Sequence, residues 1–272
     1  MPSTKTGVSW GVPFKKGQFK PAQQFILKDE NGKEVPQQSW PMAFWPDGSL
    51  KWLAFAAVVP SSDHFFIEPV KKSVLQSRGI VAEQKSGVIN IDNGLFKCVI
   101  PQKGNTLYQK ISIGEKVISE NARLVCTLEN REKAAARIIT FNDYESRIDN
   151  AELEQSGTVR AVVKLTGVHY SKEKKRELLP FTVRLYFFTG IPEIRMVHSF
   201  VFDGDQEHDF IKSLGMVFDV PLREQHHNRH IRFSGQNGGL WSESVKPLSG
   251  RYPFVFKGDR SLPLKQFASE AM

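Results

Sequence analysis

The stretch Phe181–Phe202, FTVRLYFFTGIPEIRMVHSFVF, decides the fold expected for this chain. Apolar and polar residues alternate on both sides of a Thr-Gly-Ile-Pro segment, as they do in two antiparallel strands joined by a tight turn. Pairing around a turn at Gly190–Ile191 sends alternate side chains to opposite faces of the hairpin. The stretch therefore predicts an antiparallel sheet with one buried face and one polar face.

The two faces of this hairpin have different predicted contents. The buried face is expected to carry Phe181, Val183, Leu185, Phe187, Ile194, Met196, His198, Phe200 and Phe202. The polar face is expected to carry Thr182, Arg184, Tyr186, Glu193, Arg195 and Ser199. The run Thr158–Tyr170 alternates in the same way and adds Arg160 and Lys164 to a polar face. Among apolar neighbours, His198 is expected to be a buried residue with satisfied hydrogen bonds and not a ligand.

The rest of the chain repeats the β pattern. Short runs of Val, Ile, Phe and Tyr are separated by turn residues, and a sustained helical repeat is hard to find. Residues 130–139 are compatible with a helix, or equally with a strand entered from a loop. A polar, charged segment at residues 69–87 separates a compact first unit from a longer β region. The fold expected is all-β, with a small barrel-like domain over residues 1–75 and an antiparallel β-sandwich over residues 85–272.

Charge points to an anionic partner. The chain has 37 Lys and Arg against 29 Asp and Glu, a net charge of +8, spread along its length. Nucleic acid, anionic lipid and an acidic polysaccharide are the candidates that charge alone allows. RNA-recognition and zinc-knuckle patterns are absent, which disfavours nucleic acid. The longest apolar run, Leu53–Pro60, is too short to span a membrane. The first ten residues have no apolar core, so we expect either a cytoplasmic protein or one whose leader has been removed.

Neither a metal nor a cofactor is expected. Cys98 and Cys126 are too far apart for a zinc-binding pair and are expected to be buried strand residues. His226 and His230 are four residues apart, but no HExxH glutamate accompanies them. Together with Arg223, Arg229 and Arg232 they are instead candidates for contacts with an anionic polymer. Nucleotide-binding and serine-hydrolase motifs are absent.

Three tryptophans occur in the thirteen residues of WPMAFWPDGSLKW, Trp40–Trp52. Asp47 and Gly48 suit a tight turn between two strands, because Asp bonds its own backbone and Gly accepts positive φ. Aromatic residues at this density either anchor the core of a small domain or form a stacking platform for sugars or bases. The sequence alone leaves both interpretations open.

Five segments together resemble one known family. The pairing of Ser9–Phe19 with Asp29–Trp52 looks like the N-terminal barrel of the exo-acting rhamnogalacturonan lyases, also called the YetA-like family. The segments Asn93–Ile111, Ser156–Tyr170 and Phe188–Asp205 are similar to the central β-sandwich of that family. The resemblance covers nearly the whole chain.

The resemblance implies a RIFT-type barrel, a β-sandwich and a role in pectin breakdown. Members of the family are large exported polysaccharide lyases, in which an α/α toroid after the sandwich supplies much of the catalytic surface. This chain is therefore expected to be the front of a lyase that lacks its C-terminal catalytic domain and to be inactive alone. The location implied is extracellular or periplasmic, and the partner implied is an acidic polysaccharide.

A uronate lyase needs three groups: a cation to neutralise the carboxylate, a base for the α-proton and an acid for the leaving oxygen. The resemblance makes Lys103, beside Gly104 in the loop Pro101–Tyr108, the candidate base. Arginine grips a carboxylate with two N–H groups, and tyrosine stacks on a sugar ring. The substrate-binding residues expected are Arg160, Lys164, Arg184, Tyr186 and Arg195.

Three alternatives remain open at this point. The polar face is equally compatible with a solvated surface on which Glu193 pairs with Arg184 or Arg195. The chain is also compatible with a noncatalytic carbohydrate-binding or scaffold module for acidic polysaccharides. A glycoside hydrolase with the same architecture is a third possibility.

Overall fold

The structure is a computed structural model that describes residues 5–60, 64–71, 79–131, 139–223, 225, 229–234 and 239–244. Every regular element of these residues is a β-strand, so the all-β prediction is confirmed. No helix in this part of the chain has the length and apolarity needed to cross a membrane. Residues 1–220 and residues 221–272 form two separate units.

The strands fall into three groups along the chain. The first domain contains β1 (Lys5–Pro13), β2 (Gln24–Asp29), β3 (Glu34–Val35), β4 (Gln37–Phe44), β5 (Leu50–Pro60) and β6 (Phe65–Val70). The second contains β7 (Val81–Lys85), β8 (Val88–Asp92), β9 (Lys97–Pro101), β10 (Tyr108–Ile113), β11 (Lys116–Arg131), β12 (Ile139–Gln155), β13 (Arg160–Ser171), β14 (Arg176–Phe188), β15 (Ile194–Phe200) and β16 (Asp209–Asp219). The unit 221–272 contains β17 (His230–Ser234) and β18 (Leu240–Ser244), which form an antiparallel pair.

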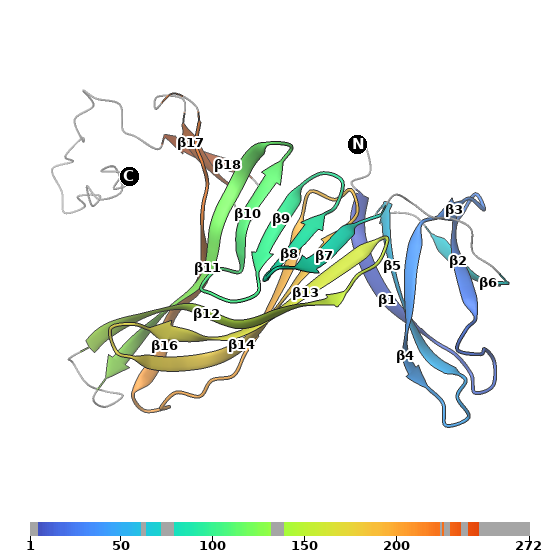
Figure 1. Cartoon of the computed structure of the whole chain (residues 1–272), viewed down its shortest axis with the longest axis horizontal. Coiled ribbons are helices and arrows are strands. Elements are labelled where there is room, and N and C mark those ends of the chain that lie inside the picture. Colours follow the sequence, from blue (N-terminus) through green and yellow to red (C-terminus); the bar gives the residue numbers. More distant parts are fainter. Residues whose placement is uncertain are drawn as a thin grey trace. The chain divides into compact units, whose positions relative to one another are not determined.

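The first domain is built from two three-stranded sheets, β1-β5-β4 and β3-β2-β6 (Figure 1). Its core is aromatic: Trp10 stacks on Phe55 with 5.7 Å between ring centroids, and Phe14 stacks on Phe25 at 5.3 Å. Phe19 meets Phe25 edge to face. A domain of this size has little interior volume, so a few large rings supply most of the buried apolar area.

The predicted turn at Asp47 and Gly48 joins β4 to β5. The Asp47 carboxylate accepts hydrogen bonds from the backbone N–H and the hydroxyl of Ser49, and these bonds lower the pKa of Asp47. Gly48 has a φ of 82°, which favours glycine over other residues. The backbone N–H of Gly48 donates to the carbonyl of Trp45 at 2.8 Å, which closes the turn. The prediction for this turn is confirmed.

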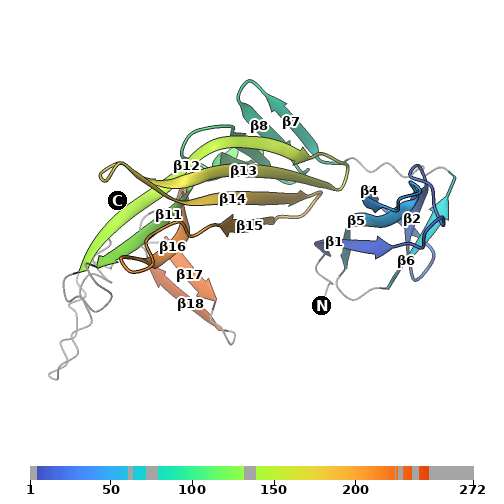
Figure 2. The ribbon, with the colours of Figure 1, turned by 90° about the horizontal axis from the view of Figure 1, so that it is seen from below.

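The second domain is one antiparallel sheet that folds over itself, in the order β15-β14-β13-β12-β11-β10-β9-β8-β7, with β16 added on β11. The long strand β11 makes the fold possible, because its first half pairs with β10 and its second half pairs with β12. Figure 2 shows β12, β13 and β14 running side by side. Where β12 no longer pairs with β11, its edge bonds the loop before β10. The backbone N–H groups of Gly104 and Ile148 each donate to the carbonyl of the other residue.

The space between the two layers is filled by aliphatic side chains. Ile89, Ile91, Cys98, Ile100 and Leu107 come from the β7–β10 layer, and Ala161, Val163, Leu165, Val183 and Leu185 come from the facing layer. All ten are less than 4% exposed, as strands with one covered face require. Cys98 and Cys126 are free and buried, as predicted, and burial raises the pKa of Cys126 to about 11.

The register predicted for the hairpin is confirmed over Phe181–Phe200, but the predicted burial of Met196, Phe200 and Phe202 is wrong. These three side chains are 36–40% exposed, because β15 is the edge strand of the sheet and Phe202 lies beyond it. Phe181 pairs with Phe200, Leu185 with Met196 and Phe187 with Ile194, so one alternate set faces the interior. The turn is held from another part of the chain by Asn93, whose side-chain amide donates to the carbonyls of Phe188 at 3.1 Å and Ile191 at 2.8 Å.

Candidate functional site

The structure brings the five predicted substrate-binding residues together on the outer face of the adjacent strands β13, β14 and β15. Lys164 lies directly opposite Arg184, and Tyr186 lies directly opposite Arg195. Arg160 begins β13 and lies at the end of this face that contacts the first domain. The shared face predicted from the alternation is therefore observed, while binding of a substrate there stays a prediction.

Two of the four cations among these residues are paired with glutamates of the neighbouring strand β12. The Arg184 guanidinium donates two hydrogen bonds to Glu154, at 2.7 and 2.8 Å, a bidentate geometry. Lys164 donates to Glu152 at 3.0 Å. Hydrogen bonding to Arg184 lowers the pKa of Glu154, so that carboxylate stays charged. Lys164 and Arg184 would have to exchange these partners to bind a uronate.

The predicted ion pair of Glu193 with Arg184 or Arg195 is wrong. Glu193 is exposed in the turn before β15, whereas the acids that reach the cations come from β12. The glutamates of β12 share the polar face because they are two residues apart and project in the same direction. Sequence analysis missed Glu152 and Glu154, and their spacing in the run Glu-Leu-Glu was the available signal.

Arg160 has neutral partners. Its Nε and one terminal nitrogen donate to Gln155 Oε1 at 2.8 and 2.5 Å, and the other terminal nitrogen donates to Ser9 Oγ at 2.8 Å. The guanidinium carbon lies 4.2 Å from the ring centroid of Trp40. Burial lowers the pKa of Arg160, although a guanidinium remains charged in proteins.

Arg195 lies at the exposed edge of the sheet, with its guanidinium 5.8 Å from the ring centroid of Tyr186. Arg160 approaches the same ring at 5.6 Å. Among the described residues, no carboxylate lies within ion-pair distance of either arginine. Arg160 and Arg195 are therefore uncompensated in the sense that neither has an ion-pair partner, in contrast to Lys164 and Arg184, although Glu154 acts electrostatically on Arg160 from beyond that distance.

Lys103, the predicted base, lies in the loop between β9 and β10. It is exposed, and within the described residues it makes no hydrogen bond or ion pair. The loop is fixed by backbone bonds between Gly104 and Ile148 and by a 2.7 Å bond from the Ser146 hydroxyl to the Asn105 carbonyl. A catalytic role for Lys103 stays a prediction.

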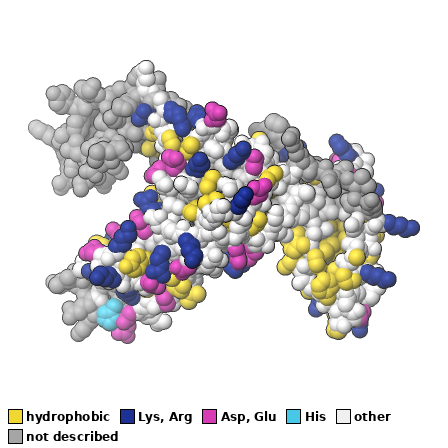
Figure 3. Space-filling view, in the orientation of Figure 1, with side chains coloured by type: hydrophobic (Ala, Val, Ile, Leu, Met, Phe, Trp, Pro, Cys, Tyr) yellow, Lys and Arg dark blue, Asp and Glu magenta, His cyan; other side chains and the backbone are white. Residues whose placement is uncertain are grey.

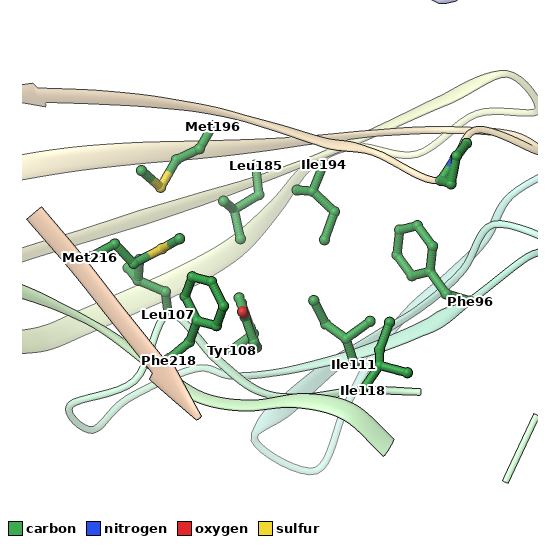
Figure 4. Close-up of a pocket in the computed structure, with 11 residues that line it drawn as sticks. Phe96, Leu107, Tyr108, Ile111, Ile118, Leu185, Ile194, Met196, Met216 and Phe218 are labelled. Atoms are coloured by element: carbon green, nitrogen blue, oxygen red, sulfur yellow. The ribbon is translucent and has the colours of Figure 1, made fainter. Parts of the chain in front are cut away.

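A cavity of about 260 Å³ opens between the layers of the sandwich (Figure 4). It is lined by Phe96, Leu107, Tyr108, Ile111, Ile118, Leu185, Pro192, Ile194, Met196, Met216 and Phe218. The single polar side-chain group among these residues is the Tyr108 hydroxyl, which already shares a 2.8 Å hydrogen bond with Ser119. A sugar needs several hydrogen-bonding partners, so this cavity does not fit one.

His198 lies on the interior face as predicted, but its hydrogen bonds are not satisfied. Its Nε2 atom is buried without a partner among the described residues, and so is Nε2 of the neighbouring His169. The rings of the two histidines are 5.8 Å apart, and His169 Nδ1 donates to the Leu179 carbonyl at 2.9 Å. Burial lowers the pKa of both histidines, which favours their neutral forms.

The histidine cluster of the sequence lies largely outside the described residues. His226 and His227 are not described, and of His230 only the backbone in β17 is described. Within the described part of the chain, no group of three or more His, Cys, Asp or Glu side chains is placed to hold a metal ion.

Comparison with known proteins agrees with this architecture. Residues 80–272 match the family model described as the PcRGLX-like protein central beta sandwich domain. Residues 1–69 match the model of the PcRGLX-like N-terminal RIFT barrel domain. The chain belongs to the PcRGLX-like family. The domain limits predicted from the sequence, at residues 75 and 85, stay predictions.

A curated relative in this family is the protein described as "Uncharacterized protein YetA" from Bacillus subtilis strain 168. It is 36% identical to this chain over 263 residues, which cover 94% of this chain and 31% of the relative. The chain therefore spans about a third of the length of the relative that it matches.

Proposed function

We propose that this chain forms the front modules of a polysaccharide lyase that acts on rhamnogalacturonan, the galacturonate–rhamnose backbone of pectin, by β-elimination. The family to which the chain belongs is named for a rhamnogalacturonan lyase. The observation that carries the proposal is the pair of arginines without an ion-pair partner, Arg160 and Arg195, which approach the Tyr186 ring from the two strands that flank β14. A cation beside an aromatic ring suits a uronate, which presents both a carboxylate and a sugar ring.

Within this lyase we assign to the chain a role in holding the acidic glycan. The described residues bring cations and the Tyr186 ring together on the outer face of β13–β15, and the carboxylates beside them, Glu152 and Glu154, are already bonded to Lys164 and Arg184. Lys103, the candidate base, lies in the loop before β10 and does not contact the five predicted binding residues. A further catalytic region in a longer protein would then supply the base and the acid, and the protein would act outside the cytoplasm.

A noncatalytic carbohydrate-binding or scaffold module is the second candidate. It is favoured by the same separation of Lys103 from the cations, because binding requires the arginines and rings and not a base. It differs from the first candidate in one outcome: the natural-length protein would bind the polymer without cleaving it.

The test is an incubation of rhamnogalacturonan with the natural-length protein that contains this chain and, separately, with the 272-residue chain. Ultraviolet absorbance follows the unsaturated uronate that β-elimination forms. We expect absorbance to rise with the natural-length protein and to stay flat with the chain alone. Release of reducing ends with no absorbance change would show a hydrolase, and neither product would show a binding module; each result would contradict the lyase proposal.

A further inference from the structure

The outward face of the sheet β1-β5-β4 carries two tryptophans over a floor of small residues. Pro13, Trp52 and Ala43 are paired across the three strands, so they share one face. Trp40 lies opposite Ala54 on the same face, diagonally next to Trp52. The smaller members of this face are Gly7, Ser9, Gly11, Ala43, Ala54 and Ala56. Small residues leave the Trp52 ring standing above the sheet, whereas Trp40 is half-buried and packs against a buried cluster that includes Phe188 and Ile191 of the second domain.

Trp52 is 41% exposed, and its six-membered ring lies against Gly11, where a Cβ atom would be 3.6 Å from the ring. It belongs to none of the buried apolar clusters of the barrel, which contain Trp10, Phe25 and Phe55 instead. Figure 3 shows hydrophobic side chains gathered over this part of the barrel. An indole ring exposed on a flat floor is available to a ligand, whereas Trp10 is not.

The surface that carries the two tryptophans borders the uncompensated arginines of the second domain. Trp40 lies under the Arg160 guanidinium at 4.2 Å, Arg160 approaches Tyr186 at 5.6 Å, and Tyr186 faces Arg195 at 5.8 Å. The contact between the domains is built from the same face, because Ser9 accepts a hydrogen bond from Arg160 and Gln38 Oε1 accepts from the backbone N–H of Arg160 at 2.9 Å. The order along the surface is Trp52, Trp40, Arg160, Tyr186 and Arg195, here called the tryptophan–arginine strip.

We propose that the tryptophan–arginine strip is a binding site for a polysaccharide in which neutral and acidic sugars alternate. A neutral sugar ring stacks on the exposed Trp52 ring, and uronate carboxylates meet the guanidinium groups beside the half-buried rings of Trp40 and Tyr186. Arg160 uses three of its five N–H groups within the protein, which leaves one on each terminal nitrogen for a ligand. The choice of a galacturonate–rhamnose chain as the occupant rests on the proposed function.

The charges of the tryptophan–arginine strip favour an acidic ligand over an apolar protein surface as its occupant. The cations in the middle of the same sheet face, Lys164 and Arg184, form ion pairs with glutamates, whereas the two arginines of the strip form none among the described residues. An uncompensated arginine beside an aromatic ring attracts an anion and would cost desolvation energy beneath an apolar partner. Single-stranded nucleic acid also combines charge with stacking rings, so the experiment includes it.

The experiment measures binding of rhamnogalacturonan oligosaccharides to the 272-residue chain by calorimetry, with carboxyl-reduced oligosaccharides and a single-stranded RNA as further probes. The variant is Trp52→Ala. The matched control is Phe66→Ala, an exposed aromatic residue (58%) of β6 in the other sheet of the barrel. We expect Trp52→Ala to weaken rhamnogalacturonan binding about tenfold, as removal of a central aromatic contact does, and Phe66→Ala to leave it unchanged.

Three results would overturn the proposal that the tryptophan–arginine strip binds the glycan: no binding by the unaltered chain, equal binding by Trp52→Ala, or tighter binding of RNA than of the glycan. Weaker binding of the carboxyl-reduced oligosaccharide supports the role of the arginines. Failure of the strip is distinguishable from failure of the lyase proposal. If Trp52→Ala binds normally while the natural-length protein still forms unsaturated product, only the strip is wrong. If no unsaturated product forms while Trp52→Ala weakens binding, only the lyase is wrong.

Discussion

Lys164 and Arg184 lie in the middle of the outer sheet face and contact Glu152 and Glu154, whereas Arg160 and the edge residue Arg195 contact aromatic rings. The four cations share one surface and one β alternation, but only the second pair has no carboxylate within ion-pair distance among the described residues. The difference teaches that a basic face is not by itself a binding site. What matters for an anion is the charge left after the neighbouring strand has contributed its acids.

The largest expected effect concerns a third kind of cation, one paired with a buried acid. Arg176 donates to both oxygens of Asp209, at 3.0 and 2.5 Å, and the Asp209 side chain is 2% exposed. We expect Asp209→Ala to lower the free energy of unfolding by roughly 3 kcal/mol, because it leaves a partly buried charge without its partner. Urea unfolding measures this, with Glu152→Ala as the control, for which we expect a change below about 1 kcal/mol. Equal losses in the two variants would contradict the distinction between buried and exposed pairs.

The same pair predicts a pH dependence. Hydrogen bonding to Arg176 lowers the pKa of Asp209 below the ordinary value of 3.8. A carboxyl group with a lowered folded pKa stabilises the protein above 3.8 and loses that contribution as the pH falls through the folded value. We therefore expect the advantage of the unaltered chain over Asp209→Asn to be largest near pH 7 and to shrink below about pH 4. Urea midpoints at several pH values measure it, and a constant or growing advantage on acidification would be inconsistent with this assignment.

A smaller effect separates the two uncompensated arginines from each other. We expect Arg160→Met to lower the free energy of unfolding by about 2 kcal/mol, since it removes the bonds to Gln155 and Ser9 and the contact with Trp40. Arg195→Met, at an exposed position, is expected to change it by less than about 0.5 kcal/mol. Thermal and urea unfolding compare the two variants. The stability role assigned to Arg160 fails if both variants unfold alike.

The smallest effect on stability is expected where an acid is removed from an exposed pair. Glu154→Gln breaks the contact with Arg184 and should cost less than about 1 kcal/mol, because both side chains are about a third exposed. It also frees a cation on the outer face, so we expect rhamnogalacturonan to bind slightly more tightly. Calorimetry measures the affinity, and weaker binding would show that Glu154 itself serves the ligand.

The fold was predictable from the sequence because the decisive hairpin is self-contained. Its alternation and its Thr-Gly-Ile-Pro turn fix which side chains oppose each other, and the structure reproduces that register. The placement of Arg160, Lys164 and Arg184 on one face follows from the same period of two. No partner from a distant segment is needed for either inference.

The ion pairs of the site were not predictable in the same way. Glu152 and Glu154 belong to β12, whose register with β13 shifts between Ile148 and Asn150 and again between Leu153 and Gln155. Each irregularity changes which residues oppose each other, and neither has a turn sequence to announce it. The shared face of Trp40 and Trp52 was not predictable for the same reason, since the pairing of β4 with β5 becomes irregular after Pro41. Local patterns therefore predicted the face, and long-range pairing decided which of its charges are free.

The most direct test of the central claim compares Arg195→Gln with Arg184→Gln in calorimetric titrations with rhamnogalacturonan oligosaccharides. Both positions are on the same sheet face, and each change removes one positive charge, so a general loss of charge affects them equally. The uncompensated charge predicts that Arg195→Gln weakens binding about tenfold, while Arg184→Gln leaves the affinity near that of the unaltered chain. Equal weakening by both changes, or a larger loss from Arg184→Gln, would contradict it.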